Sequence, residues 1–250
     1  MNEARDLRRR EYLAALGIDV WLPRGAAARA TAPAAALPAV IAPVGGAAPV
    51  AAGDPSPQWE RLRAEVAACV KCALHSTRTQ TVFGVGNLRS QWLVIGEAPG
   101  AEEDRQGEPF VGRAGQLLNA MLRAIGLPRE RVYIANMLKC RPPGNRDPKP
   151  EELACCRPYL LRQIALLEPQ IILVVGRIAA QNLLATDAPL GKLRGTAHRF
   201  GETGTPLVVT YHPAYLLRSP GEKRKAWEDL KFARALQREQ AAQKIDGHST

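Results

Sequence analysis

The sequence predicts an α/β protein: a three-layer α/β/α sandwich with a central four-stranded parallel sheet. Three observations support this fold class. Four short apolar runs, each of a length typical of buried strands, alternate with segments whose apolar residues recur at helical spacing. The connections are rich in Gly and Pro, which end helices and strands alike. Strands that alternate with helices form parallel sheets covered on both faces.

The predicted elements run from residue 58 to residue 240. Strands are expected at residues 92–97, 132–136, 171–175 and 207–210. Helices are expected at residues 59–68, 112–125, 151–167, 177–184 and 222–240. The second helix has its apolar residues on one face, and the third begins beside two prolines, where helices often start.

One domain, spanning residues 58–240, accounts for this pattern. Residues 23–57 are rich in Ala, Pro and Gly and contain no aromatic residue, so we interpret them as a flexible linker. Residues 1–22 predict a short amphipathic helix, which docks onto a protein partner, packs back onto the domain, or has neither role. Residues 241–250 are expected to form a disordered tail.

The formal net charge of +10 suits a polyanionic partner, although charge alone does not distinguish DNA-binding proteins from other basic proteins. No apolar run reaches the about 18 residues that a membrane-spanning helix needs. Glu3, Asp6 and Asp19 interrupt the pattern of a signal peptide at the N-terminus. We therefore expect a cytoplasmic monomer with no membrane association.

The five cysteines predict a metal site, because disulfides are rare in cytoplasmic proteins. Cys69 and Cys72 form a CxxC pair, and Cys140 and Cys156 follow further along the chain. This spacing fits four thiolates around either zinc or a [4Fe–4S] cluster, and the spacing alone does not choose between them. Unpaired buried thiols are the alternative.

The segment 91–122 predicts a ligand site. An apolar strand ends there in a Gly/Pro-rich turn, followed by an acidic cluster and by Phe110, whose place between Pro109 and a helix suggests an exposed ring. Ligands of open α/β sheets bind beyond the carboxyl ends of the strands. Carboxylates, a free aromatic ring and several glycines in one loop favour a flat, polar ligand. The acidic cluster comprises Glu97, Glu102, Glu103 and Asp104.

Four motifs in this order resemble those of the family 4 uracil-DNA glycosylases, the iron–sulfur branch of that superfamily. They are GEAPGAEEDRQGEPFVGRAG at 96–115, Asn136 within YIANMLKC, HPAYLLR at 212–218, and the spaced cysteines. The resemblance covers residues 59–237. It implies the uracil-DNA glycosylase fold and cleavage of the C1′–N1 bond of deoxyuridine in single- or double-stranded DNA. Such cleavage releases uracil, leaves an abasic site and begins base-excision repair.

The resemblance also implies the cofactor, a structural [4Fe–4S] cluster without a redox step. Its ligands would be Cys69, Cys72, Cys140 and Cys156. The family places its fourth cysteine directly before the equivalent of Arg157-Pro158-Tyr159-Leu160, which selects Cys156 and leaves Cys155 as a spare thiol. Adjacent helical residues point about 100° apart, so both cannot face one cluster.

The base pocket follows from the same resemblance. Phe110 would stack on an extruded base, and the Asn136 amide would accept from N3–H and donate to O4 of uracil, a polarity that cytosine reverses. His212, as a neutral imidazole, would donate to O2 as negative charge grows there. The implied substrate-binding residues are Gly96, Glu97, Ala98, Phe110, Asn136 and His212.

The water that attacks the sugar needs a carboxylate. Ala98 occupies the position of an aspartate in the better-known branch of the superfamily, so Glu97 and Glu103 are the candidates beside His212 as catalytic residues. We favour Glu103 for positioning the water and Glu97 for shaping the turn. Leu216, Leu217 and Arg218 would contact DNA. Further candidate phosphate contacts are Arg141, Arg146, Lys149, Lys192 and Arg194.

Two other functions remain open. The basic charge and the cysteines alone would suffice for a non-catalytic, metal-stapled DNA-binding module, although such a module does not explain the match at Phe110, Asn136 and His212. A relative of the family captures the abasic sugar covalently through a histidine in an inserted loop. The corresponding loop here, 141–150, contains no histidine. We therefore expect hydrolysis.

Overall fold

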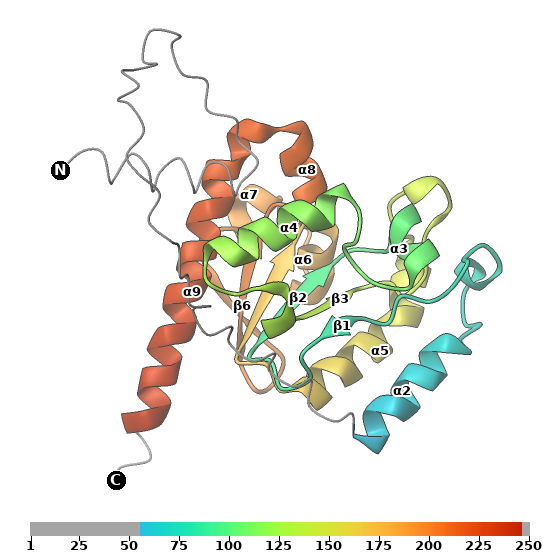
Figure 1. Ribbon diagram of the computed structural model, residues 1–250, viewed down its shortest axis with the longest axis horizontal. Coiled ribbons are helices and arrows are strands. Elements are labelled where there is room, and N and C mark those ends of the chain that lie inside the picture. Colours follow the sequence, from blue (N-terminus) through green and yellow to red (C-terminus); the bar gives the residue numbers. More distant parts are fainter. Residues whose placement is uncertain (1–55, 247–250) are drawn as a thin grey trace, which may run out of the picture.

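Residues 56–246 are described by a computed structural model, and they form a six-stranded sheet in the order β1-β3-β2-β4-β6-β5 (Figure 1). Its four central strands are mutually parallel. They are β3 (Tyr133–Asn136), β2 (Trp92–Gly96), β4 (Ile171–Val175) and β6 (Thr205–Thr210). The predicted α/β class and its parallel centre are confirmed.

The two edge strands are a correction to the predicted four-stranded sheet. β1 (Val85–Gly86) pairs antiparallel with β3, and β5 (Ala197–Phe200) pairs antiparallel with β6. β1 has only two residues, and β5 alternates exposed with half-buried residues rather than forming an apolar run. Both strands form because the neighbouring strands, β3 and β6, offer backbone N–H and C=O groups for pairing. Pairing of this kind depends on the tertiary structure and leaves little trace in the local sequence.

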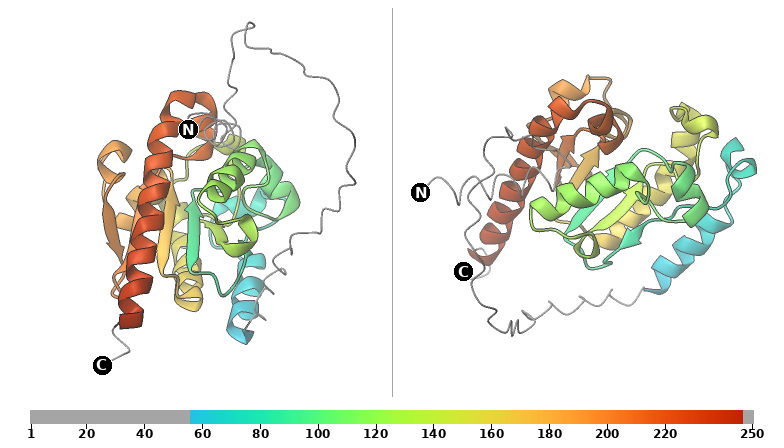
Figure 2. Two further views of the ribbon diagram at one scale, coloured as in Figure 1. Left: turned by 60° about the vertical axis from the view of Figure 1, so that its left-hand side comes forward. Right: turned by 45° about the horizontal axis from the view of Figure 1, so that its top comes forward.

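Helices cover both faces of the sheet (Figures 1 and 2). α2 (Pro57–Ala67), α5 (Pro150–Leu167) and α6 (Arg177–Leu184) pack on one face, and α4 (Arg113–Ala124), α8 (Pro213–Arg218) and α9 (Lys223–Asp246) pack on the other. Strand β2 serves both layers, since Leu93 and Ile95 join the first core and Trp92 and Val94 the second. This alternation is the two-residue period of a strand buried on both sides.

The remaining elements are short. They are α3 (Ala101–Gln106), α7 (Leu190–Leu193) and the 3-10 turns η2 (Ala73–Ser76), η3 (Arg129–Arg131), η4 (Pro143–Asn145) and η5 (Pro220–Glu222). Within the described residues, no helix is long and apolar enough to cross a membrane.

The domain boundaries differ slightly from the prediction. Pro57, expected to end the linker, is the first residue of α2, because the Ser56 hydroxyl accepts from the N–H of Trp59 at 3.2 Å and caps the helix there. α9 continues past residue 240 to Asp246. The predictions for residues 1–22, for 23–55 and for the last residues of the tail lie outside the described residues.

The sheet register places the predicted site at one edge. Gly96 at the end of β2 pairs with Asn136 at the end of β3, and Val175 of β4 pairs with Thr210 of β6. Four parallel strands therefore end together, so the segments after Gly96, Asn136 and Thr210 meet beyond the carboxyl edge of the sheet.

Candidate active site and cysteine cavity

A pocket opens beyond this edge. It is lined by Glu103 and by five of the six predicted substrate-binding residues, Glu97, Ala98, Phe110, Asn136 and His212. The same pocket is bordered by residues of the 141–149 loop and of α8, among them Asn145, Arg146, Tyr215 and Arg218. The fold thus brings together residues that lie more than a hundred positions apart in the sequence.

Asn136 is the deepest polar group of the pocket. Its side chain is only 2% exposed, and its Oδ1 atom has no hydrogen-bond partner. A Cβ on the facing Gly96 would lie 2.4 Å from this oxygen and 2.6 Å from the Phe110 ring, so only glycine fits there. Gly96 therefore serves the pocket by leaving space for the two groups. A buried acceptor without a partner costs about 1–3 kcal/mol, which a ligand that donates a hydrogen bond would recover.

Phe110 is buried, which corrects the expectation of an exposed ring. The residue is 6% exposed, and its ring centroid lies 5.6 Å from that of His212. Its φ of 55° is left-handed, a conformation that costs a non-glycine residue about 1–3 kcal/mol. The Phe110 carbonyl also approaches α4 so closely that a Cβ on Gly115 would lie 1.9 Å from its oxygen. Local sequence does not reveal a backbone forced into this region by its neighbours.

Glu103 holds the loop rather than facing the pocket with a free carboxylate. Its two oxygens accept from the backbone N–H groups of Gly100 at 3.1 Å, Val111 at 2.9 Å and Gly112 at 3.1 Å. The sequence favours Glu103 for positioning the water and Glu97 for shaping the turn. The hydrogen bonds place Glu103 in the turn-shaping role, because three donors occupy its carboxylate.

Glu97, like Glu103, is a half-buried carboxyl group that lines the pocket. Burial, reinforced by the nearby Asp147 carboxylate and opposed by Arg177, raises the pKa of Glu97 to about 7. Asp147 and Arg177 are themselves paired at 3.4 Å. Glu97 can therefore exchange a proton near neutral pH, a property often found at catalytic carboxyls.

His212 directs one ring nitrogen to the backbone and leaves the other for a ligand. Its Nδ1 accepts from the N–H of Ala214 at 3.1 Å as the residue caps α8. This bond requires an unprotonated Nδ1, so the neutral ring carries its hydrogen on Nε2. Burial, assisted by Arg218, lowers the pKa of His212 to about 4. The side chain is thus a neutral donor at physiological pH.

α8 presents only part of its predicted DNA-contacting set. Leu216 is 1% exposed and packs in the core beside α4, which corrects its assignment. Leu217 and Tyr215 are each 37% exposed, and Arg218 lines the pocket. Consecutive helical residues point about 100° apart, so Leu216 and Leu217 cannot face the same surface.

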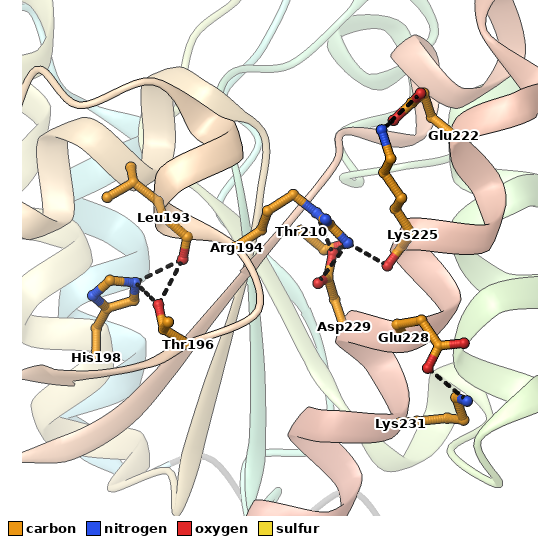
Figure 3. Close-up of polar contacts among 10 residues, drawn as sticks. All are labelled: Leu193, Arg194, Thr196, His198, Thr210, Glu222, Lys225, Glu228, Asp229 and Lys231. Carbon is orange, nitrogen blue, oxygen red and sulfur yellow. Dashed lines mark hydrogen bonds and ion pairs between the residues drawn. The ribbon is translucent and has the colours of Figure 1, made fainter.

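Arg194 is a structural residue rather than a free phosphate contact (Figure 3). Its guanidinium bonds the buried Asp229 at 2.8 and 3.0 Å, and Asp229 also accepts from the Thr210 hydroxyl at 2.8 Å. The guanidinium also lies over the Tyr211 ring, 5.1 Å from its centroid. This network anchors the end of β6 directly before His212. His198, also in Figure 3, bonds the Leu193 carbonyl at 2.7 Å and does not line the pocket.

The five cysteines line a second cavity, enclosed by residues of α2, η2 and α5. None of them forms a disulfide; Cys140 and Cys156 are buried, and Cys69 and Cys72 are half-buried. Cys155 reaches the same cavity, but its Sγ donates to the Lys71 carbonyl at 3.4 Å. Among the side chains that the structure describes, those of residues 56–240, no three of His, Cys, Asp or Glu come close enough together to chelate a single ion.

Two of the sulfur atoms each accept one hydrogen bond. Arg78 donates to Cys140 Sγ at 3.1 Å, and the backbone N–H of Lys139 donates to Cys156 Sγ at 3.3 Å. Burial raises the pKa of Cys156 to about 11, and a bound cation would favour the thiolate form of this sulfur. The buried Lys139 Nζ also donates to the Asn136 carbonyl at 2.9 Å, linking the two sites. A fully buried lysine is a feature that sequence reasoning missed.

Fold and site together define a class of protein. An open α/β sheet whose pocket holds an unsatisfied amide oxygen, a neutral histidine and an aromatic ring beside that histidine has the features of a site for a small planar polar molecule. Comparisons with known proteins specify the class further.

The family profile described as the uracil DNA glycosylase superfamily matches residues 83–231. A type-4 uracil-DNA glycosylase of Archaeoglobus fulgidus is 45% identical over 173 residues, which cover 67% of this chain and 87% of the relative. One from Thermotoga maritima is 42% identical over 180 residues, which cover 71% of this chain and 93% of the relative. A type-5 enzyme of Thermus thermophilus is 33% identical over 153 residues, covering 52% and 68%. The chain therefore belongs to the uracil-DNA glycosylase superfamily, in its type-4 branch.

Proposed function

We propose that the protein hydrolyses the C1′–N1 bond of deoxyuridine in DNA, releasing uracil and leaving an abasic site. One observation carries this proposal: the unpartnered Oδ1 of buried Asn136, in a pocket shared with His212 and Phe110. An acceptor held there matches N3–H of uracil, whereas cytosine presents an acceptor at N3. Two opposed acceptors leave both unsatisfied, which supports discrimination between the bases.

The other contacts follow from the same pose. The Asn136 Nδ2 donates to O4 of uracil, Phe110 stacks on the ring, and Nε2–H of His212 donates to O2. As the C1′–N1 bond breaks, its electron pair passes to N1 and the charge spreads onto O2. A neutral histidine donor aimed at O2 stabilises the charge at the point where it grows.

Glu97 is our choice for the water, in place of Glu103. It lies in the pocket without the three backbone bonds that occupy Glu103. As a carboxylate, Glu97 orients the water and stabilises the positive charge that develops on the sugar. The water oxygen bonds C1′, and Glu97 accepts the proton that the water loses.

We further propose that Cys69, Cys72, Cys140 and Cys156 hold a [4Fe–4S] cluster. The shared cavity, the buried thiols and the N–H donors to sulfur support this choice. When bound, the cluster supplies a rigid cross-link. Its four ligands tie the segment after α2 and the segment after β3 to α5, and the residues at the reacting atoms need no electron from it.

Water, rather than a protein side chain, is the proposed acceptor of the sugar. Among the described residues, His212 is the histidine that lines the pocket. His198 bonds the Leu193 carbonyl and His75 bonds the Cys72 carbonyl, both outside it. DNA would approach over Leu217, Tyr215 and Arg218, the exposed part of α8.

The pH dependence of excision tests the role of Glu97. The group must be ionised to act, and its pKa is raised to about 7, so kcat/KM falls as pH drops through about 7. This fall is the acidic limb of the pH profile. His212 stays neutral down to about pH 4 and does not contribute to that limb. Glu97→Gln should reduce excision about 10²–10⁴-fold and remove the limb. Rates of uracil release between pH 5 and 9 give the measurement.

Glu102→Gln is the matched control, because Glu102 lies in the same acidic cluster but is exposed and paired with Arg105. It should keep the wild-type profile. An unchanged limb in Glu97→Gln would mean that another group positions the water.

A further inference from the structure

The backbone carbonyls that flank the Phe110 ring are held by one side chain. Arg129 Nη2 donates to the Pro109 carbonyl at 2.7 Å, and its Nη1 donates to the Phe110 carbonyl at 3.3 Å. Nη1 also lies 3.3 Å from Oδ1 of Asn119 on α4. A planar guanidinium with its donors in a fixed fork suits two successive carbonyls, which a single ammonium would not span.

Arg129 is placed for this role by the fold. It begins η3, the turn before β3, and so belongs to the same segment that carries Asn136. Its side chain is only 19% exposed, and its nearest carboxylate is Glu108, at 4.0 Å. Arg129 does not line the pocket. Any effect that it has on uracil must therefore pass through the residues that it holds.

The opposite side of the same loop is held by Glu103. Glu103 accepts from the N–H groups of Val111 and Gly112, which directly follow Phe110, while Arg129 binds the carbonyls of Pro109 and Phe110. Phe110 is thus the left-handed residue between two fixed peptide groups. A strained conformation persists only where the surroundings hold it from more than one side.

We propose that Arg129 is a positioning residue for uracil binding: it holds Phe110 in its left-handed conformation, with the ring against Gly96 and beside His212. This inference rests on the proposed stacking role of Phe110. Without the guanidinium, the 109–110 carbonyls lose their donors and the loop relaxes toward ordinary backbone angles. The ring then leaves the position in which it stacks on the base.

A double-mutant cycle tests the inference. Phe110→Leu removes the stacking ring, and stacking of a base on an aromatic side chain is worth roughly 10–100-fold in binding. Arg129→Met keeps the apolar stem and removes every donor; it should weaken inhibition by free uracil and slow single-turnover excision by roughly 10-fold. In the Phe110→Leu background, Arg129→Met should change uracil inhibition and the single-turnover rate by less than 3-fold, because the ring that Arg129 positions is already absent.

Arg131→Met is the matched control, since Arg131 lies in the same turn, is exposed and loses the same charge. It should leave the inhibition constant of uracil unchanged. Thermal unfolding of each variant shows whether the protein remains folded, and Arg129→Lys, which keeps the charge but loses the fork, should recover only part of the activity.

The outcomes separate the inference from the proposed function. If Phe110→Leu costs nothing, the stacking role itself is wrong. If Phe110→Leu is costly but Arg129→Met lowers only the unfolding temperature, or has the same effect in both backgrounds, then Arg129 contributes stability alone and the inference fails.

Discussion

Asn136→Ala and His212→Ala should each reduce single-turnover excision of uracil by about 10²–10³-fold, the scale expected for the loss of one donor to a developing charge. Asn136 is buried with a free Oδ1, and the Nε2–H of His212 is fixed by the bond between Nδ1 and Ala214. Both groups are held in place before the base arrives, so their loss is not offset by solvent. The measurement is the rate of uracil release from a deoxyuridine-containing oligonucleotide with enzyme in excess.

Asn136→Asp distinguishes base recognition from catalysis. A carboxyl group changes the donor and acceptor pattern at O4 and N3, so this variant should lose discrimination against cytosine. Asn182→Ala is the control, because the Asn182 amide donates to the Ile178 carbonyl of its own helix at 2.9 Å, away from the pocket. Near-wild-type rates in both Asn136→Ala and His212→Ala would show that uracil binds elsewhere.

Cys156→Ser should abolish the brown colour and iron content expected of the purified protein and lower its unfolding temperature strongly. Cys156 is buried in the wall of the cysteine cavity and accepts from the Lys139 N–H, whereas the Cys155 thiol bonds the Lys71 carbonyl. Cys155→Ser should therefore retain iron and stability. This pair is closely matched, since the two residues adjoin on α5 and the substitution is the same.

Iron and labile sulfide per chain, with visible absorption, measure the outcome directly. One zinc per chain in a colourless protein would replace the cluster with a zinc site. Equal iron loss in the two serine variants would show that Cys155 also serves as a ligand.

The parallel centre of the fold was predicted from the sequence, and the candidate site residues were predicted from the resemblance to the family 4 motifs. Residues 171–175 and 177–184 are bounded by strong local signals, and the structure gives both elements the predicted limits. Asn136 is the last residue of β3, and His212 lies two residues after the end of β6. Side chains at these strand ends of an open α/β sheet meet a ligand. Their chemistry lies in the residue type and their position in the topology, so both are readable along the chain.

Which of Glu97 and Glu103 shapes the turn, and which has a carboxylate left for the water, was not predictable in the same way. Both carboxylates follow one strand and differ only in which backbone N–H groups the folded loop directs at them. Leu216 and Leu217 pose the same problem, because helical phase decides which of the two adjacent leucines is buried. Arg129 carries no motif at all, and its role appears only when η3 packs beside the Phe110 loop.

The sequence by itself determined the α/β class, the positions of the four parallel strands along the chain and the set of cysteines, because each depends on a periodicity or a spacing along the chain. The tertiary structure alone decided the edge strands, the buried Phe110, the free oxygen of Asn136 and the pKa of Glu97. These properties depend on distances between segments remote in sequence and on the exclusion of water from between them. Burial and unsatisfied hydrogen bonds are consequences of packing, and packing is not a local property of the chain.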